Sequence, residues 1–214
     1  MTTTGLTVES AAAFERTIAE NGIAIFPTDT LYGIACDPDS QTAADRIYEL
    51  KGRPPRKPSA VMYFSVERML GELGEGLDER TRGLIAELLP GPFTLVVANP
   101  ARRFAPACAD TPEKLGLRVP KLEGYLAPLA GVSVRVMQTS ANLSGAPDAT
   151  ALEDIDPAIV KGVDLALDGG PLLGYGSTVA DVSELEEGRW RLLRSPMPRT
   201  SGRLTELIGI PPAD

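Results

Sequence analysis

Apolar residues recur every three or four positions in several stretches of this 214-residue chain, the spacing that places them on one face of an α-helix. In the stretch 8–20, Ala11, Phe14 and Ile18 share such a face, and the following Asn21-Gly22 is suited to a helix C-terminus. The same spacing predicts further helices over 41–50, 77–89, 121–130, 155–161 and 204–208.

Short apolar runs between these helices predict strands. Residues 23–26 form a continuous apolar run, typical of a strand buried on both faces, and 132–137 alternates apolar and polar residues. Further apolar runs cover 34–36, 59–64, 93–98, 115–119, 163–167, 177–182 and 190–194. Because helices and strands alternate irregularly and no repeat is visible, we expect an α/β fold with a mixed parallel and antiparallel sheet.

Three segments without helical or strand periodicity predict loops. Residues 71–76 hold three glycines and separate two expected helices. Residues 99–114 show no clear period, and residues 168–176 contain four glycines and one proline. From their composition, we regard the last two segments as candidates for lids over a site.

The composition limits which kind of protein this is and in which cellular compartment we expect it. The hydrophobic content of 43% and charged content of 23% are ordinary for a globular protein, and the length fits one large domain. No apolar run approaches the ~20 residues of a membrane-spanning helix, and the N-terminus has no signal-peptide pattern, so we expect a cytoplasmic protein without a membrane partner. We interpret Cys36 and Cys108 as small core residues in a reducing compartment, with a disulfide as the alternative.

The absence of histidine narrows the possible chemistry. It excludes nucleophiles activated by histidine and the commonest side-chain ligand of transition metals. Two cysteines are too few for a four-cysteine zinc site. Catalysis must therefore use cationic, acidic or hydroxyl side chains, backbone amides, or a metal that enters with the substrate.

A cationic segment interrupts a chain whose formal net charge is −8. Residues 51–57 hold four Lys or Arg side chains and no carboxylate, and Gly52, Pro54, Pro55 and Pro58 keep the segment out of a helix or a central strand. A stiff cationic loop on an acidic protein suits a small polyanion, such as a nucleoside triphosphate, better than a long nucleic acid. A solvated basic turn is the alternative.

Short hydroxyl, amide and cationic side chains gather where several expected strands end. The clusters are 28–30, 51–57, 139–142 and 176–178, and Arg118 and Arg194 lie within or at the end of strands. Each cluster alone fits a turn or a helix cap. Together they are typical of a ligand site at the strand ends of an α/β fold.

The residues of these clusters match, in the same order, those of a known family. The matching motifs are Phe26-Pro-Thr-Asp-Thr-Leu-Tyr-Gly33, Lys51-Gly-Arg53, Leu117-Arg118-Val-Pro120, Thr139-Ser-Ala-Asn-Leu-Ser-Gly145, Gly176-Ser-Thr-Val-Ala-Asp181 and Leu193-Arg194. With these motifs, the chain resembles the YrdC/TsaC family over about residues 8–208. The resemblance implies a single YrdC-like domain over 1–214, in which helices flank a twisted mixed sheet with a large central cavity.

Members of this family are threonylcarbamoyl-AMP synthases, which are nucleotidyltransferases. The resemblance implies that the chain joins L-threonine, bicarbonate and ATP, releases pyrophosphate and water, and supplies the activated group for N6-threonylcarbamoyladenosine at position 37 of tRNA. Mg²⁺ is expected to arrive on the triphosphate, with no protein ligand assigned. Downstream tRNA threonylcarbamoyl-transfer proteins are the implied partners, and direct tRNA binding is expected to be weak or absent.

The resemblance also assigns roles by position. The residues given a catalytic role around the nucleotide are Lys51, Arg53, Ser140 and Asn142. The residues expected to contact ATP are Arg53, Lys57, Lys114, Asn142, Thr150 and Arg194. The residues expected to contact threonine are Thr30, Met62, Arg118, Ser140 and Ser177. Among them, Arg118 is placed to hold the substrate carboxylate with two parallel hydrogen bonds.

Some residues depart from the family pattern. Met62 stands where some relatives have histidine, so this part of the pocket is expected to be more apolar. Ser195-Pro196 follows Arg194 where the family often has Pro-Gly, and we expect no C-terminal extra domain.

Two other functions stay open. One is an RNA-binding module using the cationic loop, against which the net charge of −8 and the aromatic content of 5% argue. The other is a related carbamoyl transfer, as in hydrogenase-maturation proteins.

Overall fold

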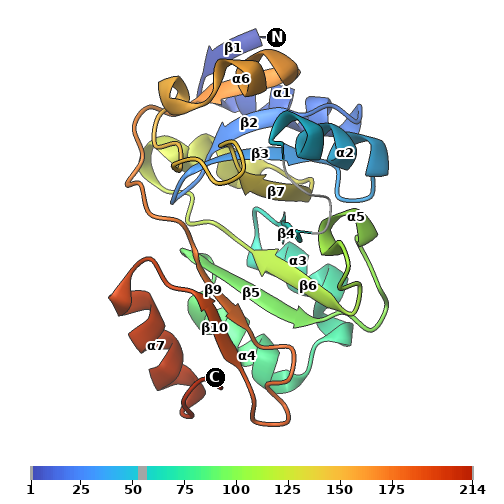
Figure 1. The fold of residues 1–214 in the computed structure, drawn as a ribbon, viewed down its shortest axis with the longest axis vertical. Helices are drawn as coiled ribbons and strands as arrows, with labels where there is room; N and C mark the ends of the chain where they lie inside the picture. The colour runs from blue at the N-terminus through green and yellow to red at the C-terminus, as the bar shows by residue number, and fades with distance from the viewer. Residues whose placement is uncertain (1, 53–56, 214) are drawn as a thin grey trace.

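Ten strands form one mixed sheet in the computed structural model, which describes residues 2–52 and 57–213 (Figure 1). The strands are β1 (Thr2–Gly5), β2 (Ala24–Pro27), β3 (Tyr32–Cys36), β4 (Ala60–Met62), β5 (Phe93–Ala98), β6 (Lys114–Arg118), β7 (Val136–Ser140), β8 (Leu165–Asp168), β9 (Thr178–Asp181) and β10 (Arg191–Arg194). Their order across the sheet is β1-β8-β2-β3-β7-β4-β6-β5-β9-β10. The β1–β8, β2–β8, β4–β6 and β5–β9 pairs are parallel and the others antiparallel, which confirms the predicted mixed sheet.

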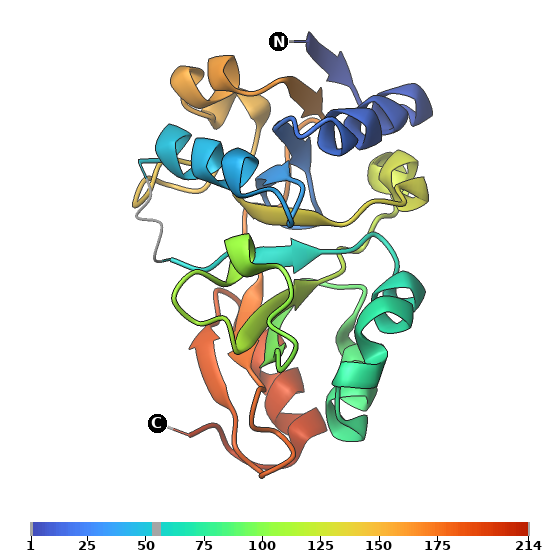
Figure 2. The same ribbon diagram turned by 90° about the vertical axis from the view of Figure 1, so that its right-hand side faces the viewer.

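Helices cover both faces of this sheet. The α-helices are α1 (Val8–Ala19), α2 (Gln41–Leu50), α3 (Val66–Leu73), α4 (Glu79–Leu88), α5 (Ala105–Cys108), α6 (Pro157–Gly162) and α7 (Pro198–Ile208). Three short 3₁₀ segments are η1 (Gly74–Gly76), η2 (Gly124–Gly131) and η3 (Leu152–Asp154). Figure 2 shows α1 and α2 on opposite faces of the sheet. In Figure 1, α4 and α7 lie beside β5, β9 and β10, at the other end of the molecule from α1 and α6.

Side-chain caps explain where several helices begin. Thr7 and Ser10 form a reciprocal capping box at the start of α1. Ser40 accepts a backbone hydrogen bond at the start of α2, Ser65 does so for α3, and Asp78 for α4. These caps satisfy amide groups that have no partner within the helix.

The core consists of two hydrophobic clusters separated by the sheet. The larger cluster contains side chains of α2 and α4 packed against strand residues, including Ile34 and Val61. In the smaller cluster, Phe14 of α1 packs against Phe26 and Phe64, with ring centroids 5.0 and 5.9 Å away. Burying such rings is the main source of stabilisation here. In the described part of the chain, no helix has both the length and the apolarity to cross a membrane.

The structure corrects several predicted elements. The strand expected over 132–137 is instead β7, which extends through Gln138-Thr139-Ser140. Polar residues are stable there because several of them face a cavity rather than apolar packing. Val132 and Val134 contribute to the smaller hydrophobic cluster before β7 begins. Their alternation thus reflects burial outside a strand.

Other boundaries also differ from the expectation. Gly71 lies inside α3 at an exposed position, where a helix tolerates glycine at a cost of about 1 kcal/mol. The segment 99–114 contains the short helix α5, and α7 begins at Pro198, a residue that fits the first helical turn. The strand β1 was not expected from its threonine-rich sequence, and it pairs with β8 at the sheet edge. Cys36 and Cys108 are buried free thiols, as predicted.

Candidate functional site

One face of the sheet forms the floor of a cavity of about 800 Å³. Gln138, Ala60, Gly116, Val96 and Asp181 form one row across β7, β4, β6, β5 and β9, and each of them lines the cavity. This row explains why the sheet face is hollow here. Ala60 and Gly116 lie within it, and neither carries a large side chain that would fill the space. The predicted large cavity therefore lies over the strands from β7 to β9.

The first polar group of the cavity surrounds Lys51, at the C-terminal end of α2. Lys51 is 3% exposed, and its Nζ donates hydrogen bonds to the main-chain oxygens of Ser140 and Asn142. Ser140 Oγ donates to Asn142 Oδ1 at 2.6 Å, and Ser144 N donates to Lys51 O at 2.9 Å. Asn142 Nδ2 also donates to Ala146 O at 2.7 Å. These bonds fix the loop after β7, so the hydroxyl and amide groups are preorganised.

The second polar group surrounds Arg118 of β6. Arg118 is 5% exposed, and its Nη2 donates to Asp29 Oδ1 at 2.6 Å, to Thr30 Oγ1 at 2.5 Å and to Thr28 Oγ1 at 3.2 Å. The other carboxylate oxygen of Asp29 accepts from Lys121 N at 3.0 Å. Arg118 Nε is buried without a hydrogen-bond partner among the described residues. A buried donor of this kind is costly unless a ligand or water pairs with it.

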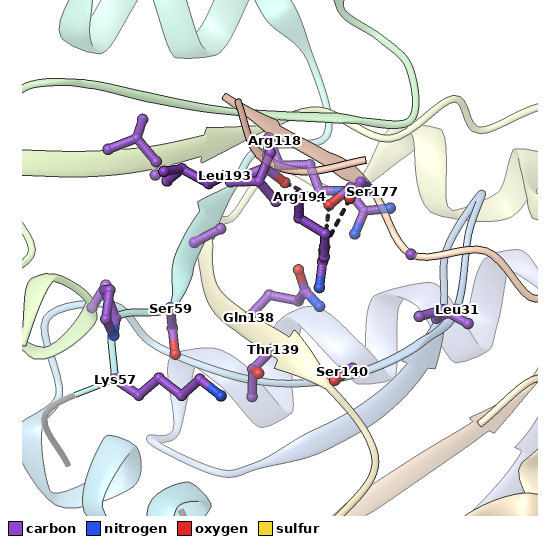
Figure 3. Close-up of a pocket in the computed structure, with 18 of the residues that line it drawn as sticks. Leu31, Lys57, Ser59, Arg118, Gln138, Thr139, Ser140, Ser177, Leu193 and Arg194 are labelled. Atoms are coloured by element: carbon purple, nitrogen blue, oxygen red, sulfur yellow. Dashed lines mark hydrogen bonds between the residues drawn. The ribbon is translucent and has the colours of Figure 1, made fainter. Parts of the chain in front are cut away.

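Arg194 of β10 and Ser177, directly before β9, lie on the same side of the cavity as Arg118 (Figure 3). Arg194 Nε donates to Ser177 O at 3.0 Å and Nη2 donates to Ser177 Oγ at 3.0 Å. The Ser177 hydroxyl is also 2.9 Å from the hydroxyl of Thr94. Burial lowers the pKa of Arg194, the charge of Asp148 opposes this shift, and the charge of Arg118 adds to it. A bound anion would thus be stabilised between the two guanidinium groups.

A third charged group lies at the β9 end of the floor. Lys114 Nζ is 2.7 Å from Asp181 Oδ2, and Ser183 Oγ donates to Asp181 Oδ1 at 2.6 Å. Burial alone would raise the pKa of Asp181, but the hydrogen bonds from Lys114 and Ser183 and the charge of Lys114 bring it below its ordinary value. Arg191 Nη2 is 3.9 Å from the same carboxylate.

The structure brings most of the predicted site residues to this one cavity. The predicted residues that line it are Thr30, Lys51, Lys57, Lys114, Arg118, Ser140, Asn142, Ser177 and Arg194. Figure 3 shows Lys57 across the cavity from Arg118, Ser177 and Arg194. The prediction for Arg53 falls outside the described residues.

Two predicted contacts are placed elsewhere. Met62 pairs in register with Arg118, but it is fully buried in the smaller hydrophobic cluster and is not among the described residues that line the cavity. The thioether packs there because Phe26 and Phe64 occupy this end of the sheet face. Thr150 is likewise absent from the described lining, and its Oγ1 donates to Asp154 Oδ2 at 2.8 Å beside η3.

Sequence reasoning assigned no role to three residues that matter for the geometry of the cavity. Asp29 pairs with Arg118, Asp181 pairs with Lys114, and Gln138 occupies the floor between the two polar groups. Asp29 and Asp181 lie inside the quoted motifs, and Gln138 directly precedes another, so their positions carried a signal. Their roles depend on cross-strand contacts that the linear sequence does not show.

The cavity also contains carboxylates, which raises the question of a metal site. Asp148 and Asp181 both line it. Within residues 2–52 and 57–213, no group of three or more His, Cys, Asp or Glu side chains is placed to hold a metal ion.

Comparisons with known proteins agree with this architecture. The Sua5_yciO_yrdC family model, described as "Telomere recombination", matches residues 16–195. A threonylcarbamoyl-AMP synthase of Bacillus subtilis (strain 168) is 30% identical over 178 residues, which cover 83% of this chain and 50% of the relative. A threonylcarbamoyl-AMP synthase of Xanthomonas euvesicatoria pv. vesicatoria (strain 85-10) is 30% identical over 155 residues, which cover 72% of this chain and 82% of the relative.

A solved structure, that of P. abyssi Sua5 complexed with L-threonine, superposes with a TM-score of 0.78 at 25% identity. The match covers 98% of this chain and 60% of the other. The chain thus spans about half the length of the B. subtilis relative and somewhat more of the P. abyssi structure. With a family model that covers most of its length and two relatives at 30% identity, the chain belongs to the Sua5/YciO/YrdC family.

Proposed function

We propose that the protein is an L-threonylcarbamoyladenylate synthase, which converts L-threonine, bicarbonate and ATP into threonylcarbamoyl-AMP, pyrophosphate and water. The observation that carries this proposal is the convergence of two chemically different groups on one cavity. Lys51, Ser140 and Asn142 lie in one group, and Thr30 and Arg118 in the other. The names of the relatives at about 30% identity support the same activity.

The reaction needs alignment of anions more than a proton relay. The threonine ammonium group first loses a proton. The resulting amine then adds to the carbon of bicarbonate, water leaves, and a carbamate remains. A carbamate oxygen then forms a bond to the α-phosphorus of ATP, and the bond between the α-phosphorus and its bridging oxygen breaks. Pyrophosphate leaves with that electron pair. Preorganised cations and hydrogen-bond donors can catalyse such a displacement without histidine.

On the amino-acid side, Arg118 would hold the threonine carboxylate. Its buried Nε has no partner among the described residues, and its Nη2 is already oriented by Asp29 and Thr30. A planar guanidinium can bind a carboxylate through two parallel hydrogen bonds, which lysine cannot. In Arg118, Nε would donate one of them, and for the second the carboxylate would replace one of the three present acceptors of Nη2. The likeness to a Sua5 structure with L-threonine supports this placement. We assign Thr30 and Ser177 to the same half of the cavity.

On the nucleotide side, Lys57 and the loop that Lys51 fixes face the same space. We propose that Lys57, Asn142 and Arg194 contact the phosphates, together with Arg53 by its place in the motif. Mg²⁺ would enter with the triphosphate, keep several water ligands and offset charge on the phosphate oxygens. The adenylate would then pass to the proteins that modify tRNA.

The direct test supplies purified protein with L-threonine, bicarbonate, Mg²⁺ and ATP, and measures pyrophosphate together with the adenylate. We expect pyrophosphate release that requires both threonine and bicarbonate. Arg118→Ala should act mainly through the KM of threonine, whereas Arg53→Ala and Lys57→Ala should act mainly through the KM of ATP. Well-folded protein that releases no threonine-dependent pyrophosphate contradicts the proposal.

A further inference from the structure

The side chain of Gln138 is an amide in the cavity floor that has no hydrogen-bond partner in the described part of the chain. It is 7% exposed and lines the cavity, and it hydrogen-bonds none of the residues that the structure describes. A primary amide carries two donor hydrogens and one acceptor oxygen. Neither amide atom is among the buried polar atoms that lack a partner, so water in the cavity can reach both of them. A ligand that displaced this water and left the amide unpaired would lose about 1–3 kcal/mol, so a ligand in this cavity is expected to pair with it.

The position of Gln138 is central between the two polar groups. Figure 3 shows its side chain on β7 between Thr139 and Ser140 on one side and Arg194 and Ser177 on the other. The same strand register places it next to Ala60. Its amide therefore lies where the amino-acid half and the nucleotide half of the cavity meet.

The neighbouring backbone makes room for this one side chain. A Cβ atom at Gly33 would lie 3.1 Å from Gln138 Nε2 and 3.2 Å from its Cγ. Contacts this short are tighter than most Cβ contacts, so the glutamine side chain would have to shift by a few tenths of an ångström. The absent side chain of Gly33 on β3 and the small side chain of Ala60 on β4 thus leave room for the glutamine between them.

Among the groups that this reaction brings to the junction, the carbamate best matches an amide. It presents an N–H donor next to a carbonyl-type oxygen, and Gln138 presents an acceptor next to a donor. The two can form a pair of parallel hydrogen bonds, with Nε2 donating to the oxygen and Oε1 accepting from the N–H. A phosphate offers only acceptors and would leave Oε1 facing negative oxygen.

We propose that Gln138 recognises the carbamoyl group on the threonine nitrogen and thereby favours the carbamoylated amino acid over threonine itself. This inference rests on the proposed function, because it takes the carbamate as the group at the junction. It gives Gln138 direct substrate contact, distinct from the roles of Arg118 at the carboxylate and of Lys51 at the loop.

Binding of a stable analogue tests the inference without turnover. N-carbamoyl-L-threonine keeps the N–H and the adjacent carbonyl oxygen of the carbamate, whereas L-threonine has N–H donors on its amino group but no carbonyl oxygen bonded to that nitrogen. With a non-hydrolysable ATP analogue present, calorimetry should show that Gln138→Leu lowers the affinity for N-carbamoyl-L-threonine about tenfold, while the affinity for L-threonine stays within about twofold. Gln41→Leu, which changes an exposed glutamine of α2, is the matched control and should alter neither affinity.

The same variants separate this inference from its alternatives. Equal affinity of wild type and Gln138→Leu for N-carbamoyl-L-threonine overturns it. So does a Gln138→Leu variant that loses affinity mainly for the ATP analogue, because the amide would then contact the adenine edge instead. Gln138→Ala, with thermal unfolding measured alongside, distinguishes lost recognition from misfolding caused by the bulk of leucine.

Kinetics supply a second readout. Gln138→Leu should raise the apparent KM of bicarbonate about tenfold and leave the KM of threonine nearly unchanged, a pattern that general loosening of the site would not produce. If the wild type releases no threonine-dependent pyrophosphate, the proposed synthase function fails. The comparison of the two threonine ligands in the binding assay still decides whether Gln138 reads a carbamoyl group.

Discussion

The two polar groups of the cavity use buried cations in different ways. We call Lys51, Ser140 and Asn142 the Lys51 cluster, and Asp29, Thr30 and Arg118 the Arg118 cluster. Lys51 donates to main-chain oxygens of the loop after β7, so its bonds determine where a segment of backbone lies. Arg118 forms an ion pair with Asp29, with side chains only 6% and 10% exposed, so its bonds hold a charge in a fixed orientation.

The Lys51 cluster therefore determines the conformation of a loop, whereas the Arg118 cluster provides a positive charge. In the Lys51 cluster, the cation organises neutral groups, and its loss should release the loop that presents Ser140 and Asn142. In the Arg118 cluster, the cation is itself the group offered to a ligand, and its loss should leave a buried carboxylate without its partner. Substitutions in the two clusters are therefore expected to fail in distinguishable ways.

The largest effect is expected from Lys51→Met. It removes the charge-assisted hydrogen bonds to the oxygens of Ser140 and Asn142, and we expect the free energy of unfolding to fall by about 3–5 kcal/mol. Threonine-dependent pyrophosphate release should fall by at least about 100-fold, because the loop is no longer preorganised. Urea denaturation and the pyrophosphate assay measure the two changes.

Lys161→Met is the matched control for this experiment, because Lys161 is an exposed lysine near the end of α6. We expect it to change unfolding by no more than about 0.5 kcal/mol. A Lys51→Met variant that keeps wild-type stability would show that the loop after β7 is held by other contacts.

Arg118→Ala should have the next largest effect, on threonine rather than on the loop. We expect the KM of threonine to rise about 100-fold and stability to fall by about 3 kcal/mol, because the Asp29 carboxylate remains buried without its cation. The KM of ATP should change much less. Steady-state kinetics with each substrate varied in turn tests this division.

A double variant sharpens the same comparison. Asp29→Ala combined with Arg118→Ala removes both charges, so it should regain part of the stability lost in Arg118→Ala while threonine binding stays defective. If the double variant is less stable than Arg118→Ala, the unpaired carboxylate is not the source of the loss.

A smaller effect is expected from Arg194→Gln. Arg194 lines the cavity, is held by two hydrogen bonds to Ser177 and belongs to neither hydrophobic cluster, so its loss should leave the fold intact. We expect kcat/KM for ATP to fall about tenfold, as for one charge-assisted phosphate contact. A change confined to the KM of threonine would instead assign Arg194 to the Arg118 side of the cavity.

The sequence allowed the fold to be predicted where burial and periodicity agree. Helix α1 and strand β5 lie where their apolar patterns indicated them, because their side chains pack against the core. β7 was misplaced by several residues because Gln138 and Ser140 face a polar cavity, so the usual rule of apolar strand residues fails there. An error of this kind is expected at a functional site, where local preferences are overridden.

The candidate site shows a similar division. Motif positions were enough to predict that Arg118, Ser140 and Ser177 share a cavity, because each lies in or beside a strand of one sheet. Motif positions did not predict correctly where Met62 lies. Its side chain packs in the smaller hydrophobic cluster with Phe64, and this contact depends on the three-dimensional fold. Nor could motif positions identify Gln138 as unpaired, since that depends on register across strands distant in sequence.

The smallest expected effect concerns Lys114 and Asp181, a third ion pair in the same cavity. Here the cation side chain is 23% exposed, against 6% for Arg118, so solvent weakens the interaction. The pKa of Asp181 is lowered from its ordinary 3.8, so its contribution to stability is complete above about pH 4 and is lost as the pH falls through the lowered value. Asp181→Asn should therefore destabilise the protein by about 1 kcal/mol at pH 7 and progressively less below pH ~4. Urea denaturation of the wild type and of Asp181→Asn between pH 7 and pH 3 measures this difference in stability. If the difference stays constant over that range, the charge of Asp181 is not the source of its contribution to stability.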